Sequence, residues 1–404
     1  MQAANRGAPA TISAFNYLAV AWLTMFVVGS DLFVLSPLLP LIASDYAVPP
    51  ASAGTCVTIF SVTYMVSAPV LGHFADRVGR QRVLIWCLCA FGAANLLTAL
   101  AGDFSWLLAT RSLAGAAAAG VSPSIYALAG ASAPPERRAT WLAIVVTGLL
   151  MSLSFGAPIG LVTAELFGWR MVFATLGALS LLLVWANSRV WPSRQIAEKR
   201  VAPTDRLTGT AVAARLAPTV LWSTALYAMY TYLGEGLGTL GYSTEEIARV
   251  ILFYGCGAIA GTLIGGRMAD RLGAKQASSI GLFGLYSGLL LLLIALHLEI
   301  FVDCAFGLAS LFAQLFFPAQ QLRLASEFPA RRAAILAWNN SALFMGISLG
   351  SLIGGQAVSL GGFDIDLMAA AAIAILGWTA NQGGGGRRAA GIRPPHRPFQ
   401  AGAG

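Results

Sequence analysis

The sequence predicts an all-α integral membrane protein whose twelve transmembrane helices form two pseudo-symmetric bundles of six. Three observations predict this fold. Hydrophobic residues make up 57% of the chain and charged residues only 10%, which is too apolar for an ordinary soluble protein. Apolar runs long enough to span a bilayer follow one another along the chain. One short motif occurs twice, 194 residues apart, and divides the chain into two equivalent halves.

A transmembrane helix needs about 20 mainly apolar residues, and twelve candidate spans satisfy or approach this length. They cover residues 17–42, 53–74, 83–101, 105–130, 140–164, 170–190, 218–240, 247–268, 277–297, 301–324, 333–357 and 366–380. The last is short for a span, at about 15 residues. It precedes a Gly-, Pro- and Arg-rich tail over 382–404 that we expect to be disordered. This end is either an ordinary basic tail or an altered C-terminus that replaces the usual end of the last helix.

Charged residues alternate between the loops. One set of loops contains Arg77, Arg80, Arg82, Arg137, Arg138, Arg194, Lys199, Arg200, Arg206, Arg215, Arg267, Arg271, Lys275, Arg331 and Arg332, together with the arginines of the tail. The other set contains Asp45, Asp103, Glu165, Glu245, Glu246, Glu299, Asp364 and Asp366, with Arg170 as almost its only cation. Because basic loops stay in the cytoplasm, we expect cytoplasmic termini and a cytoplasmic linker, 191–217, between bundles 1–190 and 218–381.

The repeated motif reads Gly-x-x-Ala-Asp-Arg-x-Gly and is followed by further basic residues. Its key positions are Gly72, Asp76, Arg77, Gly79 and Arg80 in the first copy and Gly266, Asp270, Arg271 and Gly273 in the second. The pattern resembles the loop between the second and third helices of the major facilitator superfamily. The resemblance implies alternating-access transport, with each Asp as a latch that forms contacts in one conformation only. The alternative is that the basic residues only set topology.

An arginine and an aspartate are predicted to meet inside the first bundle. Arg111 lies in the fourth span and resembles the arginine of the family's fourth-helix motif. An intramembrane arginine is costly unless it is paired, so by default it is functional. Asp31 lies about 16 Å from the outer end of its span, and Arg111 lies about 9 Å into its span from the same side. The difference in depth, about 7 Å, is within the reach of an arginine side chain, so the two residues can pair. We therefore expect an ion pair in which Asp31 carries a coupled proton, with Glu235 as the rival carrier. A purely structural pair is the alternative.

The fifth span contains Gly156, Pro158 and Gly160, followed by Gly168-Trp169-Arg170. The proline prevents a straight, fully hydrogen-bonded helix, and small residues allow close helix packing. The segment resembles the Gly-x-Pro-x-Gly motif of the superfamily's antiporters, although many members have Gly-Pro directly where this chain has Ala157 between glycine and proline. The resemblance favours export over import. Generic small-residue packing is the alternative.

Polar residues in the second half are candidates for the wall of a substrate cavity. They are Tyr227, Tyr230, Gln314, Asn339 and Asn340, although several would equally serve to bond neighbouring helices. The chain has no P-loop, histidine-based metal set or nucleophile arrangement, so we expect neither an enzyme nor a bound metal or cofactor. Five cysteines in apolar runs are expected to be core or lipid-facing residues. The net charge of +8 is scattered, which argues against a nucleic-acid partner.

These features together predict a monomeric, proton-coupled exporter of small organic molecules, most similar to the twelve-helix drug-proton antiporters that include sugar-efflux and chloramphenicol-resistance-like members. Such a protein would reside in the bacterial inner membrane and contribute to multidrug resistance. An importer or uniporter of a metabolite is one alternative. A transporter-like sensor without turnover is another.

Overall fold

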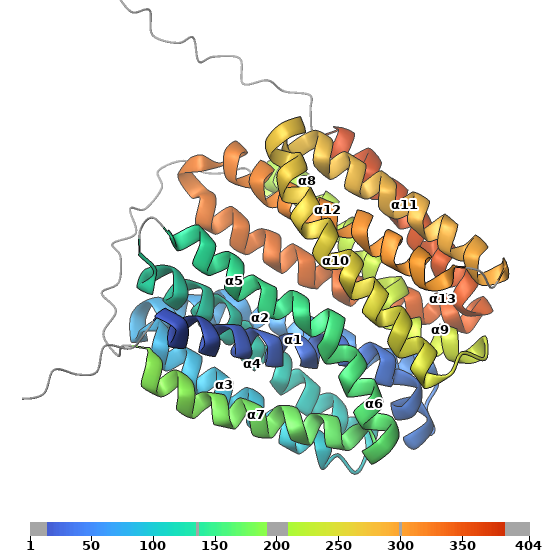
Figure 1. Ribbon diagram of the computed structural model, residues 1–404, viewed down its shortest axis with the longest axis horizontal. Helices are drawn as coiled ribbons and strands as arrows, with labels where there is room; N and C mark the ends of the chain where they lie inside the picture. The colour runs from blue at the N-terminus through green and yellow to red at the C-terminus, as the bar shows by residue number, and fades with distance from the viewer. Residues whose placement is uncertain (1–13, 135–136, 192–208, 299–300, 384–404) are drawn as a thin grey trace, which may run out of the picture.

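The computed structural model describes residues 14–134, 137–191, 209–298 and 301–383, and all regular structure in these ranges is helical. Figure 1 shows the two halves of the chain side by side, the first coloured blue to green and the second yellow to red. Ten of the described helices are long and apolar enough to cross a membrane by themselves. The predicted all-α membrane architecture is confirmed.

The first bundle consists of six spans. They are α1 (Ala14–Asp45), α2 (Pro50–Val78), α3 (Arg80–Ala99), α4 (Phe104–Ser132), a composite fifth span of α5 (Arg138–Met151), the π-helical turn η2 (Ser152–Gly156) and α6 (Ala157–Phe167), and α7 (Trp169–Val190). Within this bundle α4 packs against α2 and α3, while α7 packs against α1 and α3.

The second bundle follows the same order with two irregularities. It comprises α8 (Gly209–Thr231) with the short α9 (Leu233–Thr239), α10 (Thr244–Leu272), α11 (Ala274–Leu298), α12 (Val302–Glu327), the 3-10 turn η3 (Pro329–Arg331) and α13 (Arg332–Gly383). The seventh span breaks at Tyr232 between α8 and α9. The backbone of α13 is non-helical at Gly361 and Gly362, so this one element contains the eleventh and twelfth spans.

The twelfth span is a full-length helix, and the prediction that it is short was wrong. It runs from Phe363, just after the kink, to Gly383. Asp366 was predicted as the first residue of the span and was also counted among the loop carboxylates, whereas its side chain is buried inside the bundle. At the other end, Asn381 is also buried and continues the helix beyond the predicted limit. Residues 384–404 of the predicted tail and 192–208 of the predicted linker lie outside the described residues, and α8 begins at Gly209, before the predicted start.

The two copies of the repeated motif form the same backbone turn. Gly79 ends α2 with φ 104° and ψ 136°, and Gly273 ends α10 with φ 89° and ψ 146°. Side chains disfavour positive φ, so only glycine adopts this turn without strain. The duplicated sequence therefore gives a duplicated structure, as expected of two related bundles.

The two ends of the molecule differ in charge and in packing. We call the end with the α2–α3 and α10–α11 turns the basic end, and the end with the α1–α2 and α9–α10 turns the acidic end. The bundles meet through two symmetry-related pairs of elements, α2 with α13 and η2–α6 with α10, and through α1 with α9. The short α6 and α9 both lie at the acidic end (Figure 1). The structure is therefore sealed at the acidic end.

Candidate functional site

Asp31 and Arg111 form a bidentate ion pair in the interior of the first bundle. The Arg111 Nη1 donates to Asp31 Oδ1 at 2.8 Å, and Nη2 donates to Oδ2 at 2.7 Å. Both residues are 0% exposed. The guanidinium also lies over the rings of Phe60 and Phe173, 5.0 and 5.2 Å from their centroids. Cation–π contacts and the paired carboxylate together offset the desolvation of the charge.

The guanidinium is not fully satisfied by these contacts. Its Nη1 lies 3.5 Å from Asn95 Oδ1, at the limit of a hydrogen bond, and its Nε has no partner among the described residues. A buried donor without an acceptor is unfavourable. Arg111 therefore has bonding capacity left for a group that enters the bundle.

The fifth span packs its irregular turn directly against α1, next to Asp31. Pro158 lacks an N–H group, and the N–H of Ala157, one residue earlier, donates to the Ser152 carbonyl, five residues back, instead of four. A side chain on Gly156 would collide with Ser30, and one on Gly160 would collide with Val34. The small residues of the antiporter-like segment thus allow α1 and the fifth span to approach closely.

The same turn also contacts the second bundle. A side chain on Gly255 of α10 would collide with Ser154 of η2. The π-helical turn therefore lies between Asp31's helix on one side and the second bundle on the other. Because η2 contacts both α1 and α10, a tilt of one bundle against the other changes the packing of α10 on this turn. The turn therefore connects movement of the second bundle to the helix that contains Asp31.

Tyrosines of α8 and α10 line the contact between the bundles. The Tyr230 hydroxyl donates to the Phe33 carbonyl of α1 at 3.0 Å, and its ring stacks on Tyr254 at 5.2 Å between centroids. Tyr227 meets Tyr230 edge to face at 6.1 Å. The Ser36 hydroxyl donates in turn to the carbonyl of Thr231 at 3.0 Å. Tyr254 was not predicted as a site residue, since a single tyrosine in an apolar run carries no signal of its own.

The polar residues of α12 and α13 fall into different environments. The buried Asn339 accepts a hydrogen bond from Thr219 at 2.6 Å, so it ties α13 to α8. Asn340 interacts with the hydroxyl of Tyr64, whose ring stacks on Phe344 at 3.6 Å across the bundle contact. Gln314 is half-buried in α12. Asn340 lies where the bundles meet, which makes it a stronger cavity candidate than Asn339.

Comparison with known proteins decides the family. The family model described as Major Facilitator Superfamily matches residues 21–244 and 221–381. The chain belongs to the major facilitator superfamily. Its members are transporters, not enzymes, and this transporter is a multi-pass membrane protein with the fold of that superfamily. The structure also resembles a bacterial homologue of the human lysosomal transporter Spinster, with a TM-score of 0.76 and 16% identity over 93% of this chain and 98% of the other.

Relatives of the transporter differ in their stated substrates. An uncharacterized MFS-type transporter of Bacillus subtilis, YceJ, is 30% identical over 84% of this chain and 88% of its own length. A 3-(3-hydroxy-phenyl)propionate transporter of Escherichia coli is 29% identical over 89% and 91%. A chloramphenicol resistance protein of Streptomyces lividans is 28% identical over 65% and 68%.

The repeated motifs lie at the basic end of the transporter. Asp76 pairs with Arg80 of its own turn at 3.0 Å. The side chain of Asp270 is exposed, and it forms no ion pair with the described residues. A side chain added at Gly72 or Gly266 would meet nothing within 4 Å. The described residues thus leave room beside Gly72 and Gly266 in this conformation.

Two further carboxyl groups, those of Glu235 and Asp366, lie in the second bundle. Glu235, the predicted rival to Asp31, is half-buried in α9 at the acidic end. Asp366 was predicted in a loop, but it is 0% exposed, and neither of its carboxylate oxygens has a partner among the described residues. The prediction was wrong because Asp364 and Asp366 follow two glycines, a pattern typical of a loop.

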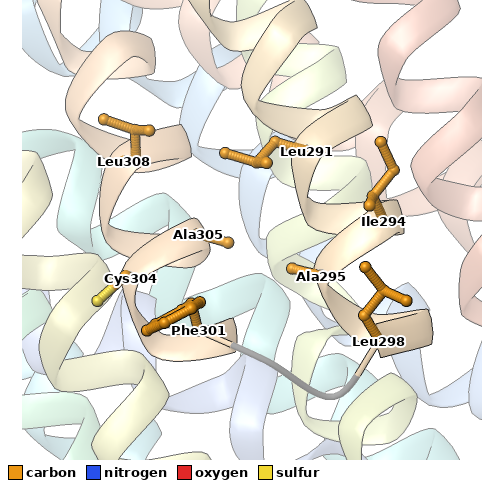
Figure 2. Close-up of a pocket in the computed structure, with 8 residues that line it drawn as sticks. All are labelled: Leu291, Ile294, Ala295, Leu298, Phe301, Cys304, Ala305 and Leu308. Atoms are coloured by element: carbon orange, nitrogen blue, oxygen red, sulfur yellow. The ribbon is translucent and has the colours of Figure 1, made fainter.

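An apolar hollow of about 190 Å³ lies between α11 and α12 at the acidic end. Figure 2 shows the side chains that line it, four from α11 and four from the start of α12 or just before it. They are Leu291, Ile294, Ala295, Leu298, Phe301, Cys304, Ala305 and Leu308. None of them carries a polar group suited to recognition, and the hollow is remote from the Asp31–Arg111 pair. We assign it no role in transport.

Proposed function

We propose that this protein exports small organic molecules from the bacterial cytoplasm in exchange for protons, by alternating access. The observation that carries the proposal is the buried Asp31–Arg111 pair beside the π-helical turn of the fifth span. In this proposal the basic end faces the cytoplasm, as the distribution of arginines favours. A relative described as an inner membrane transport protein, 28% identical over 83% of this chain, supports the bacterial inner membrane as its location.

Proton coupling follows from the chemistry of the pair. A carboxylate deep in a membrane protein is stable while an arginine neutralises it, and it takes up a proton when that contact weakens. Asp31 lies in α1, which packs against both the fifth span and α9 of the opposite bundle. Rocking of the bundles therefore changes the surroundings of Asp31, and its protonation changes with them. Glu235 is the alternative proton carrier.

Export is supported by the antiporter-like segment Gly156, Pro158 and Gly160 and by the relative that confers chloramphenicol resistance. Uptake of a metabolite is the second candidate, favoured by the relative that transports 3-(3-hydroxy-phenyl)propionate. In either case Tyr227, Tyr230, Gln314, Asn339 and Asn340 are the proposed lining of the C-terminal side of the cavity. The unpartnered Nε of Arg111 supplies a donor toward a substrate acceptor.

Transport into inside-out bacterial vesicles tests the proposal directly. Chloramphenicol and 3-(3-hydroxyphenyl)propionate are supplied outside, and the vesicle interior is acidified. An exporter that exchanges substrate for protons accumulates at least one compound, and a protonophore abolishes the accumulation. Accumulation that does not respond to the pH difference would contradict proton coupling. A compound that leaves preloaded vesicles together with protons would establish uptake instead.

A further inference from the structure

Asp366 is a buried carboxyl group that the Asp31–Arg111 pair does not use. It lies one turn into the twelfth span, close to the acidic end, and no side chain of the described residues pairs with it. Asp31 and Asp366 are the two carboxyl groups that are fully buried in the described part of the chain. Asp31 has an arginine and Asp366 has none. Burying an ionised carboxylate without a partner is strongly unfavourable, whereas its protonated form is neutral.

The structure provides space for this carboxyl group against the eleventh span. A methyl group added to Gly354 would lie 3.0 Å from Asp366 Oδ1 and 3.0 Å from the Tyr232 ring. Gly354, Tyr232 and Asp366 are therefore in one packed layer. Glycine permits the carboxyl group to approach the helix closely, and the break between α8 and α9 brings the Tyr232 ring beside it.

Tyr232 extends this layer to the contact between the bundles. Its buried hydroxyl donates to the Ser351 carbonyl at 2.9 Å, and the Ser351 hydroxyl donates to the Gly54 carbonyl of α2 at 2.7 Å. A side chain on Gly54 would collide with the Tyr232 hydroxyl. The layer that covers Asp366 is thus also part of the seal between α2 and α13 at the acidic end.

The other titratable groups near this layer do not neutralise Asp366. Tyr232 faces it from the break between α8 and α9, and Cys56 of α2 lies near Tyr232; both are neutral groups near physiological pH. Glu235 of α9 carries a charge of the same sign. His297 of α11 is held by Asp364 instead, at 3.5 Å on the exposed side of the twelfth span. The remaining charged residues of α2, α8 and α13 lie toward the basic end.

We propose that Asp366 is a second proton-binding site, occupied while the acidic end is sealed and emptied when that end opens. Opening separates Gly54 from Tyr232 and Ser351, so water gains access to the layer and the hydrated carboxyl group ionises. Sealing then requires that one proton be bound again. The ligand is a proton that comes from the side of the membrane that the acidic end faces. The inference rests on the proposed function in one respect, namely that the acidic end opens.

The direction of the pH dependence follows from this linkage. Because sealing binds a proton, the ratio of sealed to open molecules falls as pH rises, by at most about tenfold per pH unit for a single site. Asp366→Asn retains the shape of the side chain and removes the proton exchange. In that variant the acidic end is sealed at all pH values. Asp364→Asn is the matched control, since Asp364 lies two residues away with an exposed side chain.

Infrared spectroscopy of the purified, lipid-reconstituted protein tests the site without any substrate. A protonated carboxyl group has a carbonyl stretch that shifts in deuterated water. At neutral pH we expect this band in the wild type and in Asp364→Asn, but not in Asp366→Asn. A wild-type spectrum without the band would overturn the proposal, because Asp366 would then be ionised in the sealed state. If Asp366→Asn does not fold, the presence of this band in the wild type at neutral pH and its loss at high pH provide the test.

Amide hydrogen exchange tests the link to the seal. Amide exchange of residues 51–56 and 351–355 is compared between the wild type and Asp366→Asn at each pH, so that the intrinsic effect of pH on exchange cancels. We expect the two proteins to match at low pH and the wild type to exchange progressively faster as pH rises. Equal exchange at every pH would refute coupling between Asp366 and the seal. Both measurements are independent of transport, so a failure of proton-driven export leaves their outcome unaffected.

Discussion

Both carboxylate oxygens of Asp31 are bound by one guanidinium, that of Arg111, in a pair that is fully excluded from solvent. The pair joins α1 to α4 across the interior of the first bundle. Such a contact is stable only while both partners are present, because removal of either one leaves a buried charge. Its stability and its proposed proton chemistry therefore have to be tested together.

Asp31→Asn is expected to abolish accumulation driven by a pH difference while substrate exchange without a gradient continues. Asparagine keeps the shape of the side chain and cannot release a proton. The variant also leaves Arg111 unpaired, at a cost of about 3–5 kcal/mol in stability. Addition of Arg111→Gln removes that charge and is expected to recover much of the stability without recovering proton coupling.

Transport and thermal unfolding of both variants, in vesicles and in detergent, separate the two effects. Glu235→Gln is the matched control, because its half-buried side chain lies in α9 at the acidic end. Proton-driven accumulation that persists in Asp31→Asn would make Glu235 the carrier to test next.

Much of this architecture could be predicted from the sequence, for identifiable physical reasons. Long apolar runs directly indicate helices that lie in lipid. The repeated glycines Gly79 and Gly273 specify the same backbone turn in both halves. Asp31 and Arg111 could be placed near each other by depth along their helices alone. The burial of Asp366 could not be predicted in this way. Asp364, two residues earlier, has an exposed side chain, and the two aspartates point to different sides only because the segment is helical. The π-helical turn was also unpredictable in detail, since a proline indicates an irregularity but not its hydrogen bonds.

Asp76→Asn is expected to lower the turnover rate much more than the apparent affinity for substrate. Asp76 lies at the basic end and pairs with Arg80, so we expect it to act on the equilibrium between conformations and not on substrate binding. A partly exposed contact of about 1 kcal/mol changes the ratio of two states about fivefold. Initial rates over a range of substrate concentrations measure both quantities.

The second copy of the motif provides the comparison. Asp270 forms no ion pair with the described residues in this conformation, so Asp270→Asn leaves the state shown here energetically unchanged. We expect a smaller effect than that of Asp76→Asn. Normal turnover in Asp76→Asn at normal expression would exclude the latch assignment.

The orientation of the protein can be tested with two introduced cysteines. Ser44→Cys is exposed at the acidic end and Ala213→Cys at the basic end. If the basic end is cytoplasmic, a membrane-impermeant thiol reagent added to intact cells labels the first and not the second. Cys304 is exposed at the acidic end, so Cys304→Ala is the background for both. Labelling of Ala213→Cys from outside would invert the proposed topology.

Gly54→Ala is expected to weaken the seal at the acidic end. The added methyl group would collide with the Tyr232 hydroxyl and disturb the hydrogen bond from the Ser351 hydroxyl to the Gly54 carbonyl of α2. Overpacking of this kind costs about 1–3 kcal/mol, and here only the sealed conformation bears the cost. Gly102→Ala, between α3 and α4 at the same end of the molecule and outside the repeated motif, is the matched control, because a methyl group there meets nothing within 4 Å.

Labelling of Ser44→Cys in the two glycine backgrounds measures this effect. Faster labelling is expected with Gly54→Ala, and no change with Gly102→Ala. Equal rates in both backgrounds would show that the contact between α2 and α13 does not limit access to the acidic end.

The last prediction concerns the end of the twelfth span, where Asn381 joins three helices. Its amide donates to Ser278 and Ser279 of α11 at 3.1 and 2.8 Å, and its oxygen accepts from the buried Arg323 of α12 at 2.5 Å. Asn381→Ala leaves the Arg323 Nη1 donor without this acceptor, at a cost of about 1–3 kcal/mol. We expect a lower unfolding temperature in lipid or detergent. Gln382→Ala, which removes only an exposed hydrogen bond to Ser279 at 3.1 Å and leaves Arg323 paired, is expected to unfold close to the wild type. An unchanged unfolding temperature for Asn381→Ala would mean that the end of this span contributes little to the packing of the second bundle.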